Sequence, residues 1–454
     1  MENTNEQIEH LVVIKTALVN EDIDEFRTEF LSLHPYDQAQ FFMEQSRELR
    51  LKIYAYLSPE ETAEIMENIE LEDTEPFFSE MDPRFAAMVF AEMSTDDAVD
   101  ILNELEKDKV ASFLTIMNNE DAEEIKQLLH YEEKTAGSIM TTEFVALYKT
   151  YTAKQAMQHL KMEAPDAETI YYLYVIDEDK RLVGVLSLRD LIIADDDTLI
   201  EEVMGEKIVS VSVALDQEEV AQMMRDYDFL AVPVVDFQQH LLGIITVDDI
   251  LDVMEEEADD DYSKFAAVSD VGRPDENALV SAKKRLPWLI ILLFLGLLTA
   301  SLIGRFEETL EVVPFLAIFI PLIAGMAGNT GTQALAVAVR GLATGEYGEQ
   351  GKVKLILREA GTGFITGTVC GVVITVVIYL WKGEIFLGIL VGLSIMATLI
   401  VATLAGSLVP ILMDKLKIDP AVASGPFITT INDIISILIY FGMATVFMDL
   451  LIAN

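Results

Sequence analysis

The chain has 454 residues, of which 51% are hydrophobic, and its formal net charge is −46. The charge is concentrated in the first 286 residues, which carry 23 basic and 66 acidic side chains, against 8 and 11 in the remainder. Such a negative field attracts cations and excludes nucleic-acid binding. The chain has one cysteine and five scattered histidines, which disfavours disulfides and zinc or copper sites. The remaining candidate ligands are oxygen atoms, which suit Mg²⁺ or Ca²⁺.

Residues 1–130 are predicted to form an acidic domain of stacked short helices. An apolar residue recurs every 12 positions, with Gln45 as the single break: Leu33, Leu57, Ile69, Met81, Met93, Leu105, Met117 and Leu129. Good N-cap residues follow four of them, namely Ser58, Asp82, Ser94 and Asn118. This repeat predicts a small α-solenoid, a fold that binds or couples more often than it catalyses. The polar start MENTNEQIEH is unlike a signal peptide, so we expect this part in the cytosol.

Residues 131–255 contain two similar units of about 60 residues. The first holds GSIMTTEFVAL, TIYYLYVID and RLVGVLSLRDLI, and the second holds EEVMGEKIVSV, FLAVPVVD and HLLGIITVDDIL. Each unit is predicted to be a strand, a helix, two further strands and a helix. The pair resembles tandem cystathionine-β-synthase (CBS) domains, an α/β module.

The resemblance to CBS pairs implies a regulatory nucleotide such as ATP. Asp190 and Asp249 occupy the positions at which such pairs hold ribose hydroxyls, and Phe229 is a candidate for stacking on a base. Each Asp also follows a Ser or Thr by three positions, which is the pattern of a helix capping box. Both interpretations, nucleotide site and helix cap, stay open at this stage.

Residues 256–286 are predicted to link the soluble and membrane parts. An acidic run, DDILDVMEEEADDDYSKF, leads into them. Residues 263–284 are predicted to form a connecting helix that ends at three basic residues, Lys283, Lys284 and Arg285.

Residues 287–454 are predicted to form an all-α membrane domain. Five apolar spans are each long enough to cross a bilayer, near 287–305, 312–340, 358–381, 385–413 and 420–452. Basic residues at the span ends favour one side, so the soluble half is expected inside the cell and the C-terminus outside. Gly363, Gly367 and Gly371 predict a close helix contact in the third span.

The second span is predicted to be broken in the membrane. Pro314, Pro321 and three glycines surround its GNTGTQ motif. Irregular backbone at membrane depth occurs where it is buried or lines a wet cavity. Polar contacts between helices are the alternative use of this motif.

Asp433 is the one acidic residue deep inside an apolar span. Insertion of a carboxylate at the bilayer centre costs about 2.5–3.5 kcal/mol, so such residues mark ion paths. Gly425, Thr429, Asp433, Ser436 and Tyr440 recur at helical spacing, which predicts one polar stripe along a cation path.

The order of these parts, with GNTGTQ and DPAVASGPFITTINDI, resembles the MgtE family of magnesium channels over nearly the whole chain. The resemblance implies a homodimer in the lipid of the plasma membrane, with a cytosolic Mg²⁺ sensor and a connecting (plug) helix. It implies metal ligands in the pore at Asp433, Thr429 and Asp419, and in the sensor at Glu64, Asp96, Asp100, Glu218, Asp228, Asp249, Asp252, Glu257, Asp260 and Asp261. At two family ligand positions this chain has Gly425 and Arg225, which offer no carboxylate.

The resemblance implies a Mg²⁺-selective uptake channel that Mg²⁺ closes from the cytosolic side. Acids about 6 Å apart repel by roughly 3 kcal/mol at an effective dielectric near 20, and Mg²⁺ between them reverses the sign. An ion- or proton-coupled Mg²⁺/Co²⁺ transporter is the alternative, and a receptor with a CBS regulator also stays open. No His-Glu-x-x-His zinc motif or P-loop occurs, so we expect no enzyme.

Overall fold

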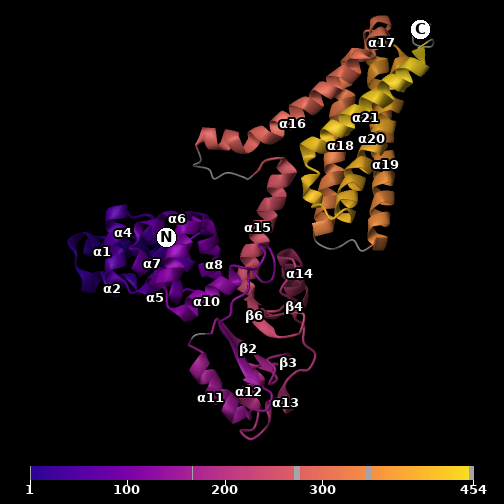
Figure 1. Cartoon of the computed structure of the whole chain (residues 1–454). Coiled ribbons are helices and arrows are strands. Elements are labelled where there is room, and N and C mark those ends of the chain that lie inside the picture. The colour runs from indigo at the N-terminus through magenta and orange to yellow at the C-terminus, as the bar shows by residue number, and fades with distance from the viewer. Residues whose placement is uncertain (1, 166, 270–276, 344–348, 449–454) are drawn as a thin grey trace. The chain divides into compact units, whose positions relative to one another are not determined.

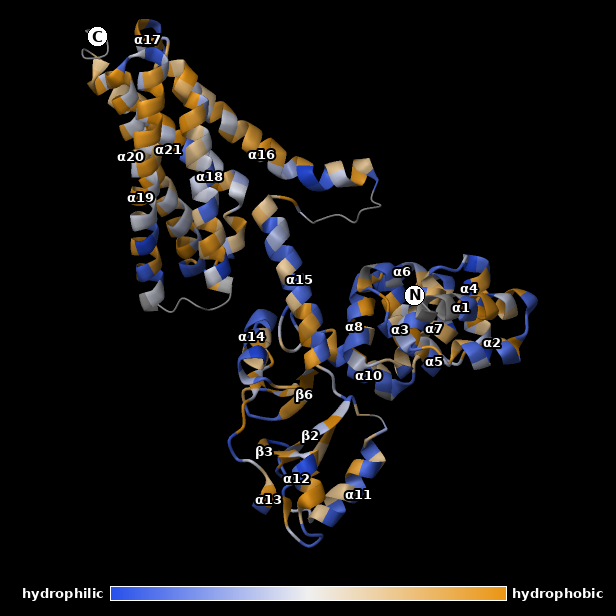
Figure 2. Cartoon of the chain, turned by 180° about the vertical axis from the view of Figure 1, so that it is seen from behind, coloured by the Kyte–Doolittle hydropathy of each residue, from blue (hydrophilic) through white to orange (hydrophobic). Residues whose placement is uncertain are grey.

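The computed structural model describes residues 2–165, 167–269, 277–343 and 349–448 (Figure 1). It contains two compact units, Met1–Met254 and Glu255–Asn454. The first holds the helical N domain and the CBS pair, and the second holds the apolar helices, which Figure 2 shows as mainly hydrophobic. The predicted domain limits at 130, 255 and 286 remain predictions.

From α2 onward, the N domain consists of short helices that start at the predicted 12-residue interval, after a longer first helix. Its ten helices are α1 (Glu2–Asn20), α2 (Ile23–Phe30), α3 (Pro35–Met43), α4 (Arg47–Tyr56), α5 (Pro59–Glu67), α6 (Leu71–Glu80), α7 (Pro83–Glu92), α8 (Thr95–Glu104), α9 (Lys107–Ile116) and α10 (Asn119–Leu128). The apolar residue of the grid ends a helix and is buried, as at Met93 and Leu105. Burial of one such residue per helix against its neighbours makes one continuous core, so the solenoid prediction is confirmed.

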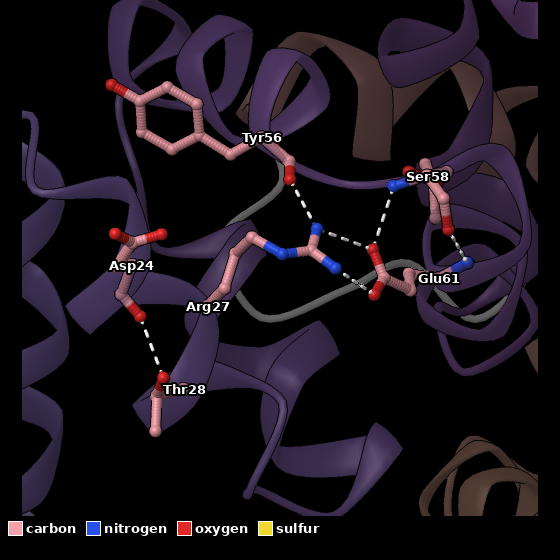
Figure 3. A network of polar contacts seen from close by, with 7 residues as sticks. Asp24, Arg27, Thr28, Tyr56, Ser58 and Glu61 are labelled. Atoms are coloured by element: carbon pink, nitrogen blue, oxygen red, sulfur yellow. Dashed lines mark hydrogen bonds and ion pairs between the residues drawn. The ribbon is translucent and has the colours of Figure 1, made fainter.

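An ion pair joins the start of the N domain to the helix stack (Figure 3). Both terminal nitrogens of Arg27 on α2 donate to Glu61 on α5, at 2.9 and 2.6 Å. Glu61 also closes a capping box with Ser58. Although partial burial raises the pKa of Glu61, the hydrogen bonds and charge of Arg27 and the hydrogen bonds of Ser58 together outweigh it, and the pKa is lowered. The carboxylate therefore fixes the turn between α4 and α5 while it holds α2.

The CBS pair contains two equivalent three-stranded sheets. The first sheet has the strand order β1 (Phe144–Tyr148), β2 (Thr169–Ile176) and β3 (Leu182–Ser187). The second has the order β4 (Val211–Ser212), β5 (Ala231–Val235) and β6 (Leu241–Thr246). In each sheet the first two strands are parallel and the last two are antiparallel. Helices α11 (Ala153–Glu163), α12 (Leu188–Ile193), α13 (Ile200–Val203) and α14 (Gln217–Tyr227) complete the pair. The hairpin turns match as well: Asp177 and Asp236 each accept two backbone N–H bonds. The predicted duplication is confirmed.

The linker differs from the prediction. Helix α15 (Val247–Ala266) continues from the second CBS unit through the whole acidic run. It ends at Ala266, because the next residue, Ala267, has a φ of 56° in the left-handed region that helices do not continue through. A connecting helix over 263–284 is therefore wrong, although residues 270–276 lie outside the described part.

Among the described residues, five helices are long and apolar enough to cross a membrane, as predicted. They are α16 (Ala278–Gly304), α18 (Leu316–Ala343), α19 (Glu349–Lys382), α20 (Ile385–Lys415) and α21 (Gly425–Val446), with α17 (Glu307–Val312) and the 3₁₀ turn η1 (Pro420–Val422) between them. A Cβ on Gly363, Gly367 or Gly371 would lie within 3.0 Å of α20. The close contact predicted for these glycines is confirmed.

The predicted break in the second span is wrong. Helix α18 runs without interruption through Pro321 and GNTGTQ. Its glycines serve close packing instead, because a Cβ on Gly328 would press on Thr429 and one on Gly331 would overlap the Asn432 side chain. The same backbone also touches Gly406 on α20. Helix contacts therefore replace the cavity that the pattern suggested.

Candidate magnesium sites

The N-terminus of α8 is the centre of an acidic cluster in the first unit. Asp96 lies in its first turn and is 8% exposed, and its Oδ1 has no hydrogen-bond partner in the part of the chain that the structure describes. Asp249, at the start of α15, interacts electrostatically with both Asp96 and Asp97. Two predicted sensor residues from distant parts of the chain are thus brought together.

Three further carboxylates bind the same helix end. Thr95 donates to Glu143 from its backbone N–H (3.1 Å) and its hydroxyl (2.8 Å). Ser94 donates its N–H to Glu67 (2.8 Å) and its hydroxyl to Glu168 (3.2 Å). Free N–H groups and the positive end of the helix dipole favour carboxylates here. Ser94 accordingly makes no side-chain cap of its own.

Sequence reasoning missed these three glutamates and Asp97. No periodic pattern marks them, because Glu143 and Glu168 come from the first CBS unit and Glu67 from α5. The structure shows one sign of them: Ser94 is the N-cap residue of α8 but makes no side-chain cap. The sequence alone does not show this.

Burial and mutual repulsion raise the pKa of this cluster. The pKa of Asp97 rises to about 8, chiefly through burial and then through Glu67 and Asp249. Burial likewise raises the pKa of Glu143 to about 7 and that of Asp249 to about 6, and it raises the pKa of Asp96 well above its usual value. A divalent cation would remove the same penalty by neutralising charge directly.

The other predicted sensor residues of the first unit are more dispersed. Asp100 lies close enough to raise the pKa of Asp97, and Glu64 that of Glu67. Glu218 and Asp228 lie at opposite ends of α14. At 1.5 Å per residue they are about 15 Å apart along the helix, so they do not ligate one ion together. Asp252 lies exposed on α15.

The predicted nucleotide residues have local roles in the structure. The Ser187 hydroxyl donates to Asp190 (2.6 Å) and the Thr246 hydroxyl donates to Asp249 (2.5 Å). Both pairs thus sit at helix starts, as in the capping alternative. Phe229 stacks on Tyr227 at 5.3 Å between ring centres, which covers one of its two faces.

In the second unit, two predicted ligands, Asp260 at the end of α15 and Asp419, form ion pairs with a lysine side chain. Lys264 donates to Asp260 (2.8 Å) and to Asp419 (2.5 Å). Burial, and next the charge of Asp419, raise the pKa of Asp261 to about 6, and Glu257 contributes to the same rise. Asp419 also accepts the backbone N–H of Ala421 through its other oxygen (2.8 Å).

Asp433 lies half-buried on α21, and its carboxylate makes no hydrogen bond within the described residues. Thr429, one turn earlier, is also half-buried. Two predicted members of the polar stripe have other roles. Ser436 is fully buried, and Tyr440 is 1% exposed and donates to the Leu316 carbonyl at 3.0 Å. The stripe as one continuous wall is therefore wrong, and Thr429 and Asp433 are its accessible part.

Within the described ranges, no three His, Cys, Asp or Glu side chains already form a metal-binding group. Mg²⁺ retains most of its water and needs few protein oxygens. The orphaned oxygen of Asp96, surrounded by other carboxylates, suits a hydrated hard cation. The end of α15 suits a divalent cation less well, because the ammonium group of Lys264 already binds the carboxylates there.

In the described part of the chain, five apolar helices, one of which carries the carboxylate of Asp433, follow an acidic unit with a CBS pair, and they define a multi-pass membrane protein of the ion-transport class. Family models match along the chain: the MgtE intracellular N domain at 33–134, CBS domains at 136–197 and 200–256, and MgtE, a divalent cation transporter, at 320–443. The magnesium transporter MgtE of Enterococcus faecalis is 52% identical over 99% of both chains, and that of Bacillus subtilis is 43% identical over 94% of both. The chain belongs to the MgtE family of magnesium transporters, a class that is not enzymatic.

Two solved structures each match about half of the chain. The soluble part of a magnesium transporter is 51% identical, covers 55% of this chain and 98% of its own, and superimposes with a TM-score of 0.54. The cytosolic domain of the Mg²⁺ channel MgtE in complex with ATP is 38% identical, covers 54% and 99%, and has a TM-score of 0.51. A similarity to the inosine-5'-monophosphate dehydrogenase of Halalkalibacterium halodurans spans 83 residues, or 18% of the chain, and carries no argument for catalysis.

Proposed function

We propose that this protein is a Mg²⁺-selective channel that admits magnesium across the plasma membrane and is closed by cytosolic Mg²⁺. The observation that carries the proposal is the half-exposed, unpaired carboxylate of Asp433 on α21. An ionisable group at membrane depth with no partner among the described residues calls for a cation.

The proposed ion path follows Thr429 and Asp433. In a homodimer, the carboxylate of each subunit would bind a hydrated Mg²⁺ through its water shell. Asn329 and Gln333 on α18 are exposed in this chain, which would let polar groups from a second helix line the same path. The membrane potential drives entry by about 2.3 kcal/mol per charge per 100 mV, doubled for a dication.

The proposed sensor is the acidic cluster at α8. Without metal, the charges of Asp96, Asp97 and Asp249 oppose the docking of the N domain on the CBS pair. Mg²⁺ at this cluster removes the repulsion and favours the docked, closed state, which is a population shift by a ligand. The N-terminus is proposed to be cytoplasmic and the C-terminus external, on the basis of the charge distribution.

ATP is proposed as a further regulatory ligand of the CBS pair. The support is the ATP complex of a relative's cytosolic domain and the position of Asp190 and Asp249 at matching helix starts. Binding of ATP to the purified protein, lost in Asp190→Ala but retained in Asp197→Ala, is the expected result of equilibrium dialysis.

The alternative is an ion- or proton-coupled transporter. Coupling commonly requires several ionisable groups within the membrane, and Asp433 is the deep one in the described helices. Electrical recording of the protein in planar bilayers separates the two functions. Discrete unitary currents whose open probability falls as cytosolic Mg²⁺ rises into the millimolar range support the channel, whereas flux without unitary events, dependent on a proton gradient, supports coupling.

A further inference from the structure

Lys264 connects the end of α15 to the start of the last membrane helix. Its ammonium group donates to Asp260 one turn earlier (2.8 Å) and to Asp419, the residue before η1 (2.5 Å). All three side chains are about one-third exposed, so the contact is partly shielded from water. Ion pairs with such shielding are stronger than exposed ones.

Apolar packing accompanies this ion pair. Phe265 packs against a buried cluster that contains Ala421, Ala423 and Ile428. A Cβ on Gly425, the first residue of α21, would lie 3.5 Å from the Phe265 carbonyl oxygen. The last turn of α15 is thus seated directly on the chain that enters α21, the helix that bears Asp433.

The carboxylates at this point do not fit a divalent ion while Lys264 is present. One oxygen of Asp419 accepts the Ala421 N–H and the other accepts Lys264. Partial burial alone would lower the pKa of Lys264, but its hydrogen bonds to Asp260 and Asp419 more than offset this and raise the pKa. The lysine therefore stays charged at neutral pH.

We propose that Lys264 is a positioning residue that takes the place of a metal ion here and holds the end of α15 on the start of α21 without Mg²⁺. Its function as part of the gate rests on the proposed channel. Mg²⁺ then acts at the α8 cluster. The contact between the end of α15 and the start of α21, called the joint below, persists in either state of the sensor. Loss of the ammonium would remove the cation that Asp260 and Asp419 share beside Asp261, and the contact between α15 and α21 would come to depend on Mg²⁺.

Hydrogen exchange of the purified full chain, followed by mass spectrometry, tests this proposal. Peptides that cover residues 255–268 and 416–424 are compared in EDTA and in 10 mM Mg²⁺ for wild type, Lys264→Gln and Lys264→Arg. Lys352→Gln is the matched control. Lys352 on α19 forms an equally short pair (2.5 Å) with Asp414, near the C-terminal end of α20.

The wild type should protect both peptides equally with and without Mg²⁺. Lys264→Gln should exchange roughly tenfold faster in EDTA and recover in Mg²⁺, while Lys264→Arg should behave as wild type and Lys352→Gln should leave both peptides unchanged. Unchanged exchange in Lys264→Gln, a loss that Mg²⁺ does not restore, or an equal loss in Lys352→Gln would each overturn the proposal. A wild-type channel that ignores cytosolic Mg²⁺ would instead contradict the proposed function and leave this joint intact.

Discussion

Asp96 is a buried carboxylate with an unpartnered oxygen, and Asp97, Glu143 and Asp249 surround it. An acid in this position acquires either a proton or a cation, because burial penalises its charged form. Its chemistry therefore makes the stability of the soluble unit depend on both pH and Mg²⁺.

Replacement of Asp96 by asparagine should stabilise the first unit when metal is absent. The amide keeps the shape and removes a buried charge. Since about 1 kcal/mol shifts the melting temperature of a domain of this size by roughly 2–4 °C, we expect an increase of a few degrees in EDTA and a smaller gain from added Mg²⁺. Thermal unfolding of the soluble part measures both. Asp197→Asn, at an exposed acid, is the control, and a lower melting temperature for Asp96→Asn in EDTA would be the contrary result.

Acidification should also stabilise the metal-free unit. Asp97, Glu143 and Asp249 have folded pKa values of about 8, 7 and 6, all above their ordinary values. The folded state therefore binds more protons, and stability declines as pH rises through these values. We expect a higher melting temperature at pH 6 than at pH 8 in EDTA, and a smaller difference in Mg²⁺. A melting temperature that rises with pH over this window would contradict the assignment.

At the scale of elements, the contact between α18 and α21 fixes the direction of Asp433. Asn432 is 1% exposed, and its amide reaches the Ala327 carbonyl at 3.5 Å. Gly331 leaves the space that this side chain fills. Because neighbouring residues on a helix point about 100° apart, a rotation at Asn432 would also turn Asp433.

A methyl group at Gly331 should therefore impair Mg²⁺ flux, and a smaller residue at 432 should relieve it. We expect Gly331→Ala to reduce flux about tenfold and the double variant Gly331→Ala/Asn432→Ala to recover most of it, since contacting residues couple non-additively. Flux in liposomes at equal protein content is the measurement. Gly325→Ala on the same helix meets no described atom within 4 Å and should be neutral. Additive losses in the double variant would refute the contact.

The elements that follow from sequence periodicity were predicted well, and those set by contacts between distant residues were not. The 12-residue interval predicted the helix stack because one buried residue per helix is a local requirement. The CBS duplication was similarly visible. By contrast, GNTGTQ suggested a broken helix, since glycine breaks helices in water, whereas here its missing Cβ atoms admit Thr429 and Asn432. The bond of Lys264 to Asp419 and the bonds of Glu143 to Thr95 carry no local signal, because these partners are far away in the chain.

For the whole molecule, the acids of the first unit should govern resistance to protease. Mg²⁺ at millimolar concentration should protect the soluble half of the full chain from cleavage, because it favours the docked state. Neutralisation of Asp96, Asp249 and Asp252 together should remove this protection and leave the channel open. Protection that persists unchanged in the triple variant would show that the sensor lies elsewhere.

The account depends on Asp433, whose carboxylate is proposed to meet hydrated Mg²⁺ in the membrane. Mg²⁺ uptake into liposomes that contain the purified protein, for wild type and Asp433→Ala, tests it most directly, with Glu311→Ala as the control at an exposed acid of the same unit. We expect uptake to fall to the level of empty liposomes in Asp433→Ala and to persist in the control. Undiminished uptake by a well-folded Asp433→Ala protein would contradict the proposed ion path.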